Sequence, residues 1–220
     1  MFLKTGEMKK IMKSSLKKHG LIVGNIKERY LVYSDCWGAA VEHKYASNKF
    51  KAAIMELIGD LPEEGECYEY TIDADKDLQQ QAYYGYPDPY EDWMRAKDYA
   101  VAAPMYLHAW PHEYMVYQKK SDLEFITPKR SLTEAVISAS ELDHATESMP
   151  DRPSVLNGTV LYYKNESTIY WVHTESPGRK ALEVLFPHLC GINFFEDDWR
   201  LKAGMDSEDA KEAANEQLQY

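Results

Sequence analysis

Apolar residues recur along the chain in one repeated order, which is a strand, a polar turn, a second strand and then a helix. The first repeat begins between Gly20 and Ser34, where two apolar strands flank a polar turn at residues 25–29. Ser47 then has the side chain of a helix N-cap, and Gly59 stands where that helix would end. Between these two residues, the apolar positions 50, 54, 57 and 58 share one helical face.

The same order returns twice further along the chain. Strands are predicted at 113–117 and 123–127, and a capping-box pattern then opens a helix over 131–142. Strands at 159–164 and 168–174 precede a third helix, which starts at residues 176–177. Additional strands are expected at 66–72, 101–107 and 192–195. We therefore predict an α+β protein, with mostly antiparallel sheet or sheets built from β-hairpin–helix (ββα) units whose helices pack on the sheet.

The two ends of the chain differ from its middle. Residues 1–18 are basic and predict an N-terminal tail or a short helix, with Met8, Ile11, Met12 and Leu16 on one side. Residues 19–204 form the predicted α+β domain, with two subdomains split near residue 100 as the alternative. Residues 205–220 hold almost no apolar side chains and predict an acidic C-terminal tail.

Cysteine usage and hydropathy favour a cytoplasmic protein. The chain holds three cysteines far apart, which argues against a disulfide framework. It has no run of about 18 apolar residues, the length of a membrane-spanning helix. Lys4 also interrupts the apolar start of the chain, where a signal peptide would need a longer apolar stretch.

Acidic residues outnumber basic ones, and the excess is unevenly spread. The net charge is −11, from 36 Asp and Glu against 25 Lys and Arg. Residues 60–98 alone hold twelve acids and three bases, whereas residues 1–20 hold six Lys and one Glu. A folded body this acidic repels phosphate backbones, so we expect no direct binding of nucleic acid. A surface that only keeps the protein soluble is the alternative.

Residues 73–98 combine acids with aromatic rings and two prolines. A long connection of this kind is typical of a functional loop, and aromatic side chains are favoured at protein interfaces. The alternative is that the tyrosines fold back onto the sheet and complete the core. The predicted partner-binding residues are Glu63, Glu64, Glu66, Asp73, Asp75, Asp77, Tyr83, Tyr84, Tyr86, Asp88, Tyr90, Glu91, Asp92 and Trp93.

These features favour a non-enzymatic binding protein whose partner is a protein with a basic surface. Carboxylates on a rigid sheet can imitate the charge spacing of a phosphate backbone, so we expect a partner that handles nucleic acid. In size and composition the chain resembles the anti-restriction and anti-CRISPR inhibitors of phages and mobile elements. We expect no contact with membranes, and homo-oligomerisation stays open.

Motifs for metal or cofactor chemistry are missing from the sequence. His108 and His112 are separated by Pro111 and have no further ligands at a metal-binding spacing, so we expect no metal site. No Gly-rich loop joins a strand to a helix, so we expect no nucleotide or other cofactor.

Cys36 is the one candidate nucleophile. The stretch Ser34-Asp-Cys-Trp-Gly38 resembles the Asp-Cys-Ser-Gly turn of the cysteine peptidases that cleave bacterial cell walls. The resemblance implies the alternative function, a hydrolase in which Cys36 acts with His43 or His173. Such a cysteine needs a pKa lowered by a helix N-terminus or by an imidazole. A small buried side chain at the end of a strand is the structural alternative.

Overall fold

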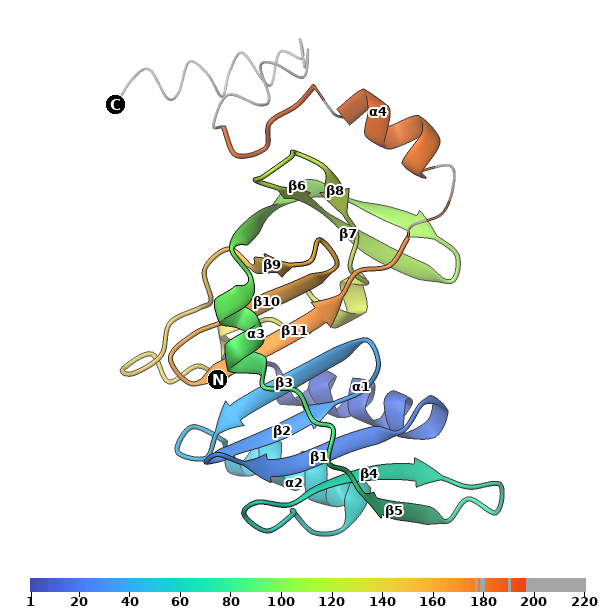
Figure 1. Cartoon of the computed structure of the whole chain (residues 1–220), viewed down its shortest axis with the longest axis vertical. Helices are drawn as coiled ribbons and strands as arrows, with labels where there is room; N and C mark the ends of the chain where they lie inside the picture. The colour runs from blue at the N-terminus through green and yellow to red at the C-terminus, as the bar shows by residue number, and fades with distance from the viewer. Residues whose placement is uncertain (177, 179–180, 190, 197–220) are drawn as a thin grey trace.

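Eleven strands form one antiparallel sheet in the computed structural model, which describes residues 1–176, 178, 181–189 and 191–196 (Figure 1). Across the sheet the strands follow the order β5-β4-β1-β2-β3-β11-β10-β9-β6-β7-β8. The strands are β1 Leu21–Ile26, β2 Arg29–Tyr33, β3 Trp37–Glu42, β4 Cys67–Ile72, β5 Leu78–Ala82, β6 Asp98–Ala109, β7 His112–Lys119, β8 Phe125–Ile126, β9 Ser154–Leu156, β10 Val160–Lys164 and β11 Thr168–His173. The helices are α1 Thr5–Lys18, α2 Asn48–Ile58, α3 Pro89–Arg95 and α4 Phe186–Leu189. The predicted α+β class with a large antiparallel sheet is confirmed.

The repeated hairpin–helix unit is not clearly reproduced. Helix α2 follows three consecutive strands, β1, β2 and β3, rather than a hairpin. Strands β6 and β7 are followed by β8 and by short 3₁₀ turns at Arg130–Leu132 and Ala139–Glu141. After β11, a π-helical turn at Ala181–Leu185 leads into α4. The two halves of the sheet are joined by pairing between β3 and β11, which lie far apart in the sequence.

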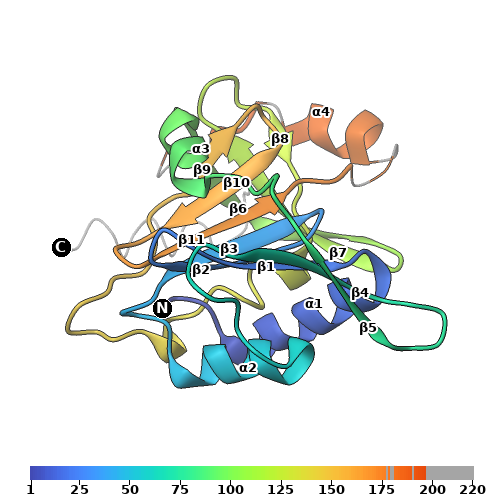
Figure 2. The same ribbon diagram turned by 60° about the horizontal axis from the view of Figure 1, so that its bottom comes forward.

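Helices α1 and α2 cover one face of the sheet (Figure 2). Helix α1 buries Met8, Met12 and Leu16, which share one side as their spacing predicts. The three residues that open the chain are buried with them. The α-amino group of Met1 donates a 2.6 Å hydrogen bond to Glu147 Oε2, and this pair is almost fully buried. The basic residues of α1 therefore lie on a helix that is anchored in the core.

Helix α2 begins and ends where the sequence predicts. The Ser47 hydroxyl accepts a 3.1 Å hydrogen bond from the Phe50 amide, which satisfies one of the free N–H groups of the first turn. Gly59 ends the helix with a φ of 92°, a conformation that favours glycine. None of the helices in the described part of the chain is long and apolar enough to cross a membrane.

The helix predicted over residues 131–142 is wrong. Backbone hydrogen bonds within this segment form only isolated turns, and two others tie it to the start of the chain. Val136 O accepts a 2.8 Å hydrogen bond from the Lys4 amide, and the Ser138 amide donates to Phe2 O at 2.8 Å. Buried backbone groups must find partners, and here the partners are distant in sequence. The segment therefore stays irregular and covers the α1 side of the sheet.

Two other differences lie at the edges of the sheet. The strand predicted over residues 192–195 is a pair of turns, because Phe194 is buried against β6 and β7 and its amide donates to Gln118 Oε1 at 2.8 Å. Strand β5 has no apolar alternation, and all of its residues are exposed, so it forms through its pairing with β4. The predicted third helix falls partly, and the acidic tail wholly, outside the described residues.

The second face of the sheet, which we call the α3 face, carries its own apolar cluster. Its buried members are Leu31, Tyr33, Ala40, Val160, Tyr162, Ile169 and Trp171, from β2, β3, β10 and β11. Helix α3 lies in front of these strands, and the chain between β5 and α3 runs up to it across the same face (Figure 1). The two faces are thus covered by different parts of the chain, and the aromatic segment of the sequence covers the α3 face.

Candidate functional site

Residues 83–95 lie across the α3 face and direct their aromatic rings in two ways. Tyr83 and Trp93 pack against the apolar cluster, and the Tyr83 ring lies 6.4 Å from the Tyr33 ring in an edge-on arrangement. The exposed apolar side chains of this segment are Tyr84 (89 %), Tyr86 (38 %), Tyr90 (41 %) and Met94 (58 %). The folding of rings onto the sheet is therefore found for two of the predicted residues, while three other tyrosines face outward.

Acidic side chains stand between the exposed rings. We call this patch the ring-acid surface, and it consists of Tyr84, Tyr86, Asp88, Tyr90, Glu91, Asp92 and Met94. Its acids lie at the start of α3, where carboxylates stabilise a helix through its dipole. The patch is continuous in sequence and rests on a packed layer of rings beneath it.

Asp88 fixes the beginning of α3 within the ring-acid surface. Its Oδ1 accepts hydrogen bonds from the amides of Tyr90 at 3.1 Å and Glu91 at 3.2 Å, as expected of an N-cap followed by proline. Its Oδ2 accepts a 2.6 Å hydrogen bond from Lys27 Nζ in the turn between β1 and β2. The bond from Lys27 lowers the pKa of Asp88, with help from the two amides and against the effect of burial. Asp88 thus stays ionised and ties α3 to the sheet.

Asp92 fixes the middle of α3. The Tyr162 hydroxyl, on β10, donates a 3.5 Å hydrogen bond to Asp92 Oδ2, and Arg95 pairs with the other oxygen. Burial raises the pKa of Tyr162, and the Asp92 carboxylate adds to that shift, so this hydroxyl remains a donor. The cation of Lys164 also lies 4.9 Å from the ring centre of Trp93. Helix α3 is short, but the β1–β2 turn and strand β10 hold it.

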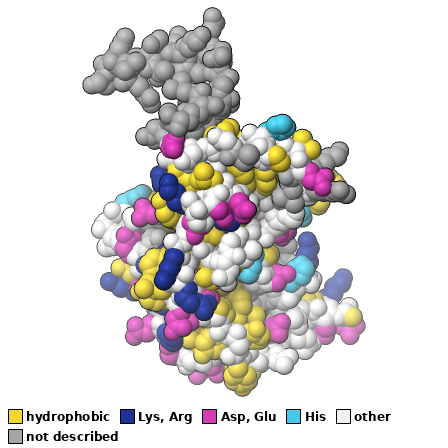
Figure 3. Space-filling model, turned by 45° about the horizontal axis from the view of Figure 1, so that its top comes forward, with side chains coloured by type: hydrophobic (Ala, Val, Ile, Leu, Met, Phe, Trp, Pro, Cys, Tyr) yellow, Lys and Arg dark blue, Asp and Glu magenta, His cyan; other side chains and the backbone are white. Residues whose placement is uncertain are grey.

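The remaining predicted acids fall into two separate groups. Glu63, Glu64 and Glu66 precede β4 and lie near the turn that carries Lys27, since Glu64 Oε1 accepts a 3.3 Å hydrogen bond from the Glu28 amide. Asp73, Asp75 and Asp77 follow β4, so a strand of six residues, about 20 Å long, separates the two groups. On the face shown in Figure 3, acidic and basic side chains are interspersed over the described residues.

The second acidic group has a local structural task. Asp73 Oδ1 accepts hydrogen bonds from the amides of Asp75 at 3.0 Å and Asp77 at 2.9 Å, and its Oδ2 accepts one from Gln79 at 2.7 Å. These bonds, chiefly the one from the Asp77 amide, lower the pKa of Asp73. Asp73 therefore shapes the hairpin turn between β4 and β5, far from the ring-acid surface.

The structure separates Cys36 from His43, one of its two candidate histidine partners. Cys36 precedes β3 and His43 follows it, so a six-residue strand of about 20 Å lies between them. His173 is closer, because its amide donates a 2.9 Å hydrogen bond to Cys36 O. Burial raises the pKa of the Cys36 thiol to about 11, and Asp35 adds to this shift. A catalytic cysteine needs the opposite shift, so these positions weigh against the hydrolase hypothesis.

Among the described residues, no group of three or more His, Cys, Asp or Glu side chains is arranged to hold a metal ion. His108 and His112 lie at the two ends of the turn between β6 and β7, and His108 Nδ1 is 3.7 Å from Glu113 Oε1. Both histidines are exposed, and so are Trp110 and Pro111 in the turn between them.

Two cationic residues at the site are absent from the sequence-based prediction. Lys27 and Arg29 flank the turn between β1 and β2, and Arg29 Cζ lies 5.7 Å from the ring centre of Tyr90. A signal in the sequence was available, because this turn carries Lys-Glu where two-residue hairpins favour Asn-Gly. Residues that disfavour the turn conformation indicate that their side chains have a role outside the turn.

In comparisons with known proteins, the sequence matches no family model and no curated protein. The assignment of a function therefore rests on the geometry of the described residues.

Proposed function

We propose that this protein is a non-enzymatic binding protein whose ring-acid surface docks on the basic surface of a protein partner. The observation that carries the proposal is the exposure of Tyr84, Tyr90 and Met94 on a segment that is held at Asp88 and Asp92. Rings of this kind are favoured anchors of interfaces. Because the backbone beneath them is already ordered, little conformational entropy is lost when a partner binds.

Charge supports a basic partner. Asp88, Glu91 and Asp92 alternate with the exposed rings, and the whole chain carries a net charge of −11. Complementary charge accelerates encounter and disfavours acidic partners, including nucleic acid itself. We extend the proposal to a partner that uses its basic surface to handle nucleic acid, so that docking would block that surface. Free thiols at Cys36 and Cys67 support a reducing compartment such as the cytoplasm.

The test compares three immobilised forms of the protein in a lysate treated with nuclease. The first is the wild type, and the second carries Tyr84→Ser, Tyr90→Ser and Met94→Ser. The third is a control with three other exposed apolar residues changed elsewhere, Met55→Ser, Leu78→Ser and Tyr106→Ser. We expect the wild type and the control to retain the same basic protein, and the ring variant to lose at least 10-fold of it.

Two further arms define the chemistry of that partner. Retention should fall steeply between low and moderate salt, since charges on an exposed surface are screened within about 10 Å at 0.1 M salt. Added DNA or RNA should release the retained protein, since both ligands would share one basic surface. Equal retention by the ring variant contradicts docking through this surface. Release by salt but not by nucleic acid contradicts the extension to a nucleic-acid-handling partner and leaves the docking surface supported.

A further inference from the structure

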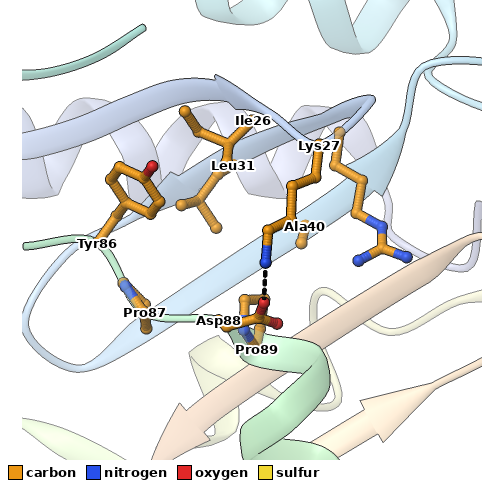
Figure 4. A pocket seen from close by; sticks show the side chains of 9 residues that line it. Ile26, Lys27, Leu31, Ala40, Tyr86, Pro87, Asp88 and Pro89 are labelled. Carbon is orange, nitrogen blue, oxygen red and sulfur yellow. Dashed lines mark hydrogen bonds and ion pairs between the residues drawn. The ribbon is translucent and has the colours of Figure 1, made fainter. Parts of the chain in front are cut away.

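A small cavity of about 70 Å³, open to solvent, lies beside the ring-acid surface, between the β1–β2 turn and the chain that leads to α3 (Figure 4). Leu31 on β2 and Ala40 on β3 project into it from the sheet. Tyr86, Pro87 and Pro89 close it from the overlying segment. Small-molecule sites are typically concave and mostly apolar with a few placed polar groups.

The cavity exists because the sheet beneath it carries small side chains. Residues 38, 40 and 42 of β3 point toward the α3 face, and the first two are Gly38 and Ala40. The indole of Trp171 fills the space over Gly38, whereas the space over Ala40 is left to the cavity. The prolines at 87 and 89 hold the covering chain in an extended path above it.

The polar groups of the cavity are mainly donors. Lys27 Nζ donates to Asp88 Oδ2 and has two further N–H groups to offer, as the side chain reaches across the cavity in Figure 4. The Arg29 guanidinium forms an ion pair with Glu42 Oε1 at 3.8 Å and lies 5.7 Å from the ring centre of Tyr90, but it donates no hydrogen bond to a described residue. The Arg29 side chain is nonetheless only 29 % exposed. A half-buried guanidinium with free donors is prepared for an anion.

The β1–β2 turn beside the cavity has a strained backbone. Lys27 and Glu28 have φ values of 52° and 59°, although neither is glycine or asparagine. The turn between β9 and β10 has positive φ at the corresponding two positions, 52° and 70°, and uses Asn157 and Gly158 there. The β9–β10 turn therefore has residues that favour this conformation, whereas the β1–β2 turn has residues that disfavour it. Residues held in such conformations cluster at ligand sites, because the surrounding structure maintains the strain for a use.

The strained turn is held by contacts from three sides. The Glu28 amide donates to Glu64 Oε1 at 3.3 Å, Glu28 O accepts from the His43 amide at 2.9 Å, and Lys27 reaches Asp88. These contacts fix the direction in which Lys27 and Arg29 leave the backbone. The positions of both cations are therefore set before any ligand arrives, which reduces the entropy lost on binding.

We propose that this cavity binds a small organic carboxylate with an aromatic or aliphatic body. The carboxylate would accept hydrogen bonds from the Arg29 guanidinium and from Lys27 Nζ, and the body would lie on Leu31, Ala40 and Tyr86. Arg29 has the planar fork that matches a carboxylate with two parallel bonds. This inference goes beyond the docking of a protein partner, and it can succeed or fail on its own.

The test uses phenylacetate as the probe and follows the protein by two-dimensional NMR. For a ligand of this size we expect a Kd of about 1 mM, with shifts concentrated in residues 26–31 and 86–90. Phenylacetamide has the same shape without the charge, and it should bind at least about 10-fold more weakly. Phenyl phosphate tests the type of anion, and we expect weaker binding than for the carboxylate.

Variants separate the charge from the cavity. Arg29→Gln should weaken phenylacetate binding by about 10-fold or more and leave phenylacetamide unchanged, while Arg95→Gln on the exposed side of α3 serves as the matched control. Ala40→Leu should abolish binding of both probes by filling the cavity. Tyr86→Ala should weaken the binding of both probes, and it leaves β3 unchanged because Tyr86 lies outside the sheet. Equal binding of acid and amide, wild-type binding by Arg29→Gln, tighter binding of phenyl phosphate, or shifts elsewhere in the protein would each overturn the proposal.

Discussion

The indole ring of Trp171 lies directly against the backbone of Gly38, on the neighbouring strand. A Cβ atom at residue 38 would stand 2.0 Å from Trp171 Cζ2, far inside the van der Waals distance. Trp171 is only 4 % exposed, and its ring lies 6.0 Å from the ring of Tyr33 and 6.3 Å from that of Tyr162. Because Gly38 has no side chain, the layer of rings beneath the ring-acid surface can pack flat on the sheet.

Gly38→Ala should therefore destabilise the protein. The added methyl group has to displace a ring that is packed on all sides, which costs about 1–3 kcal/mol of unfolding free energy. Urea denaturation followed by tryptophan fluorescence measures this loss. The matched control is Gly6→Ala, because Gly6 lies in α1 with nothing within 4 Å of the new atom. That change should raise stability by about 0.5–1 kcal/mol. Equal stability of the two variants would contradict the packing of Trp171 on Gly38.

The strained turn makes a second prediction about stability. Glu28→Gly should raise the free energy of unfolding by about 0.5–1 kcal/mol, since glycine adopts a φ of 59° without strain. The reverse change, Gly158→Glu in the β9–β10 turn, should lower it by a similar amount. Denaturant titration of the two variants measures both effects. A loss of stability in Glu28→Gly would show that this turn is not strained.

The sequence predicted α2 correctly and the segment at 131–142 wrongly, because the first depends on local signals and the second on a long-range contact. Helix α2 was predictable because its cap, its apolar face and its terminating glycine lie within 13 residues, from Ser47 to Gly59. The segment at 131–142 has equally good local signals, but the Val136 carbonyl and the Ser138 amide bond to the backbone of residues 2–4. A contact between the start and the middle of the chain leaves no trace in the local pattern.

The candidate site shows the same limit. The composition of residues 73–98 was enough to single out the segment, but not to tell which rings face the sheet. Tyr83 and Tyr84 are adjacent in sequence, yet the first packs on Tyr33 and the second is 89 % exposed. The acids at 73–77 have a composition like that of α3, but they lie at the far end of β4. The pairing of β4 with its neighbours shows that the acids at 73–77 and those of α3 lie apart, which the composition alone does not show.

The buried pair of Met1 and Glu147 predicts a pH-dependent stability. Glu147 accepts hydrogen bonds from the Met1 ammonium at 2.6 Å, from the Asp143 amide at 3.1 Å and from the Ser167 hydroxyl. Burial raises the pKa of Glu147, but these bonds outweigh it, and the net effect is a lowered pKa. Because the folded pKa is lowered, the stabilisation is complete above the ordinary pKa of the carboxyl and is lost as the pH falls through the folded value.

Glu147→Gln should accordingly cost about 3 kcal/mol at pH 7, because it leaves a buried ammonium without its partner. The difference between wild type and variant should be constant between about pH 5 and pH 7 and shrink below about pH 4. Urea titrations at several pH values give this curve. The control Glu56→Gln removes an exposed carboxylate that pairs with Lys9, and it should change stability by less than about 0.5 kcal/mol. A pH-independent difference for Glu147→Gln would contradict an ionised Glu147.

Cys36 should react slowly with thiol-directed reagents. Burial raises its pKa to about 11, so at pH 7.5 its thiolate fraction is more than about 10-fold below that of a free cysteine. Iodoacetamide labelling followed by peptide mass spectrometry measures the rate, with Cys67 as an internal comparison because burial raises its pKa to about 11 as well. Labelling of Cys36 faster than a free thiol at neutral pH would instead favour the hydrolase hypothesis.

The most direct test of docking through the ring-acid surface is an NMR titration with a short peptide rich in Lys and Arg. Amide shifts should concentrate in residues 84–95 and weaken as salt is raised, because a basic probe should find its ring anchors and acids together only there. The acids at 63–66 and 73–77 serve as built-in controls of similar charge without exposed rings at their centre. Shifts that follow these acids equally, or that ignore residues 84–95, would contradict a docking surface on α3.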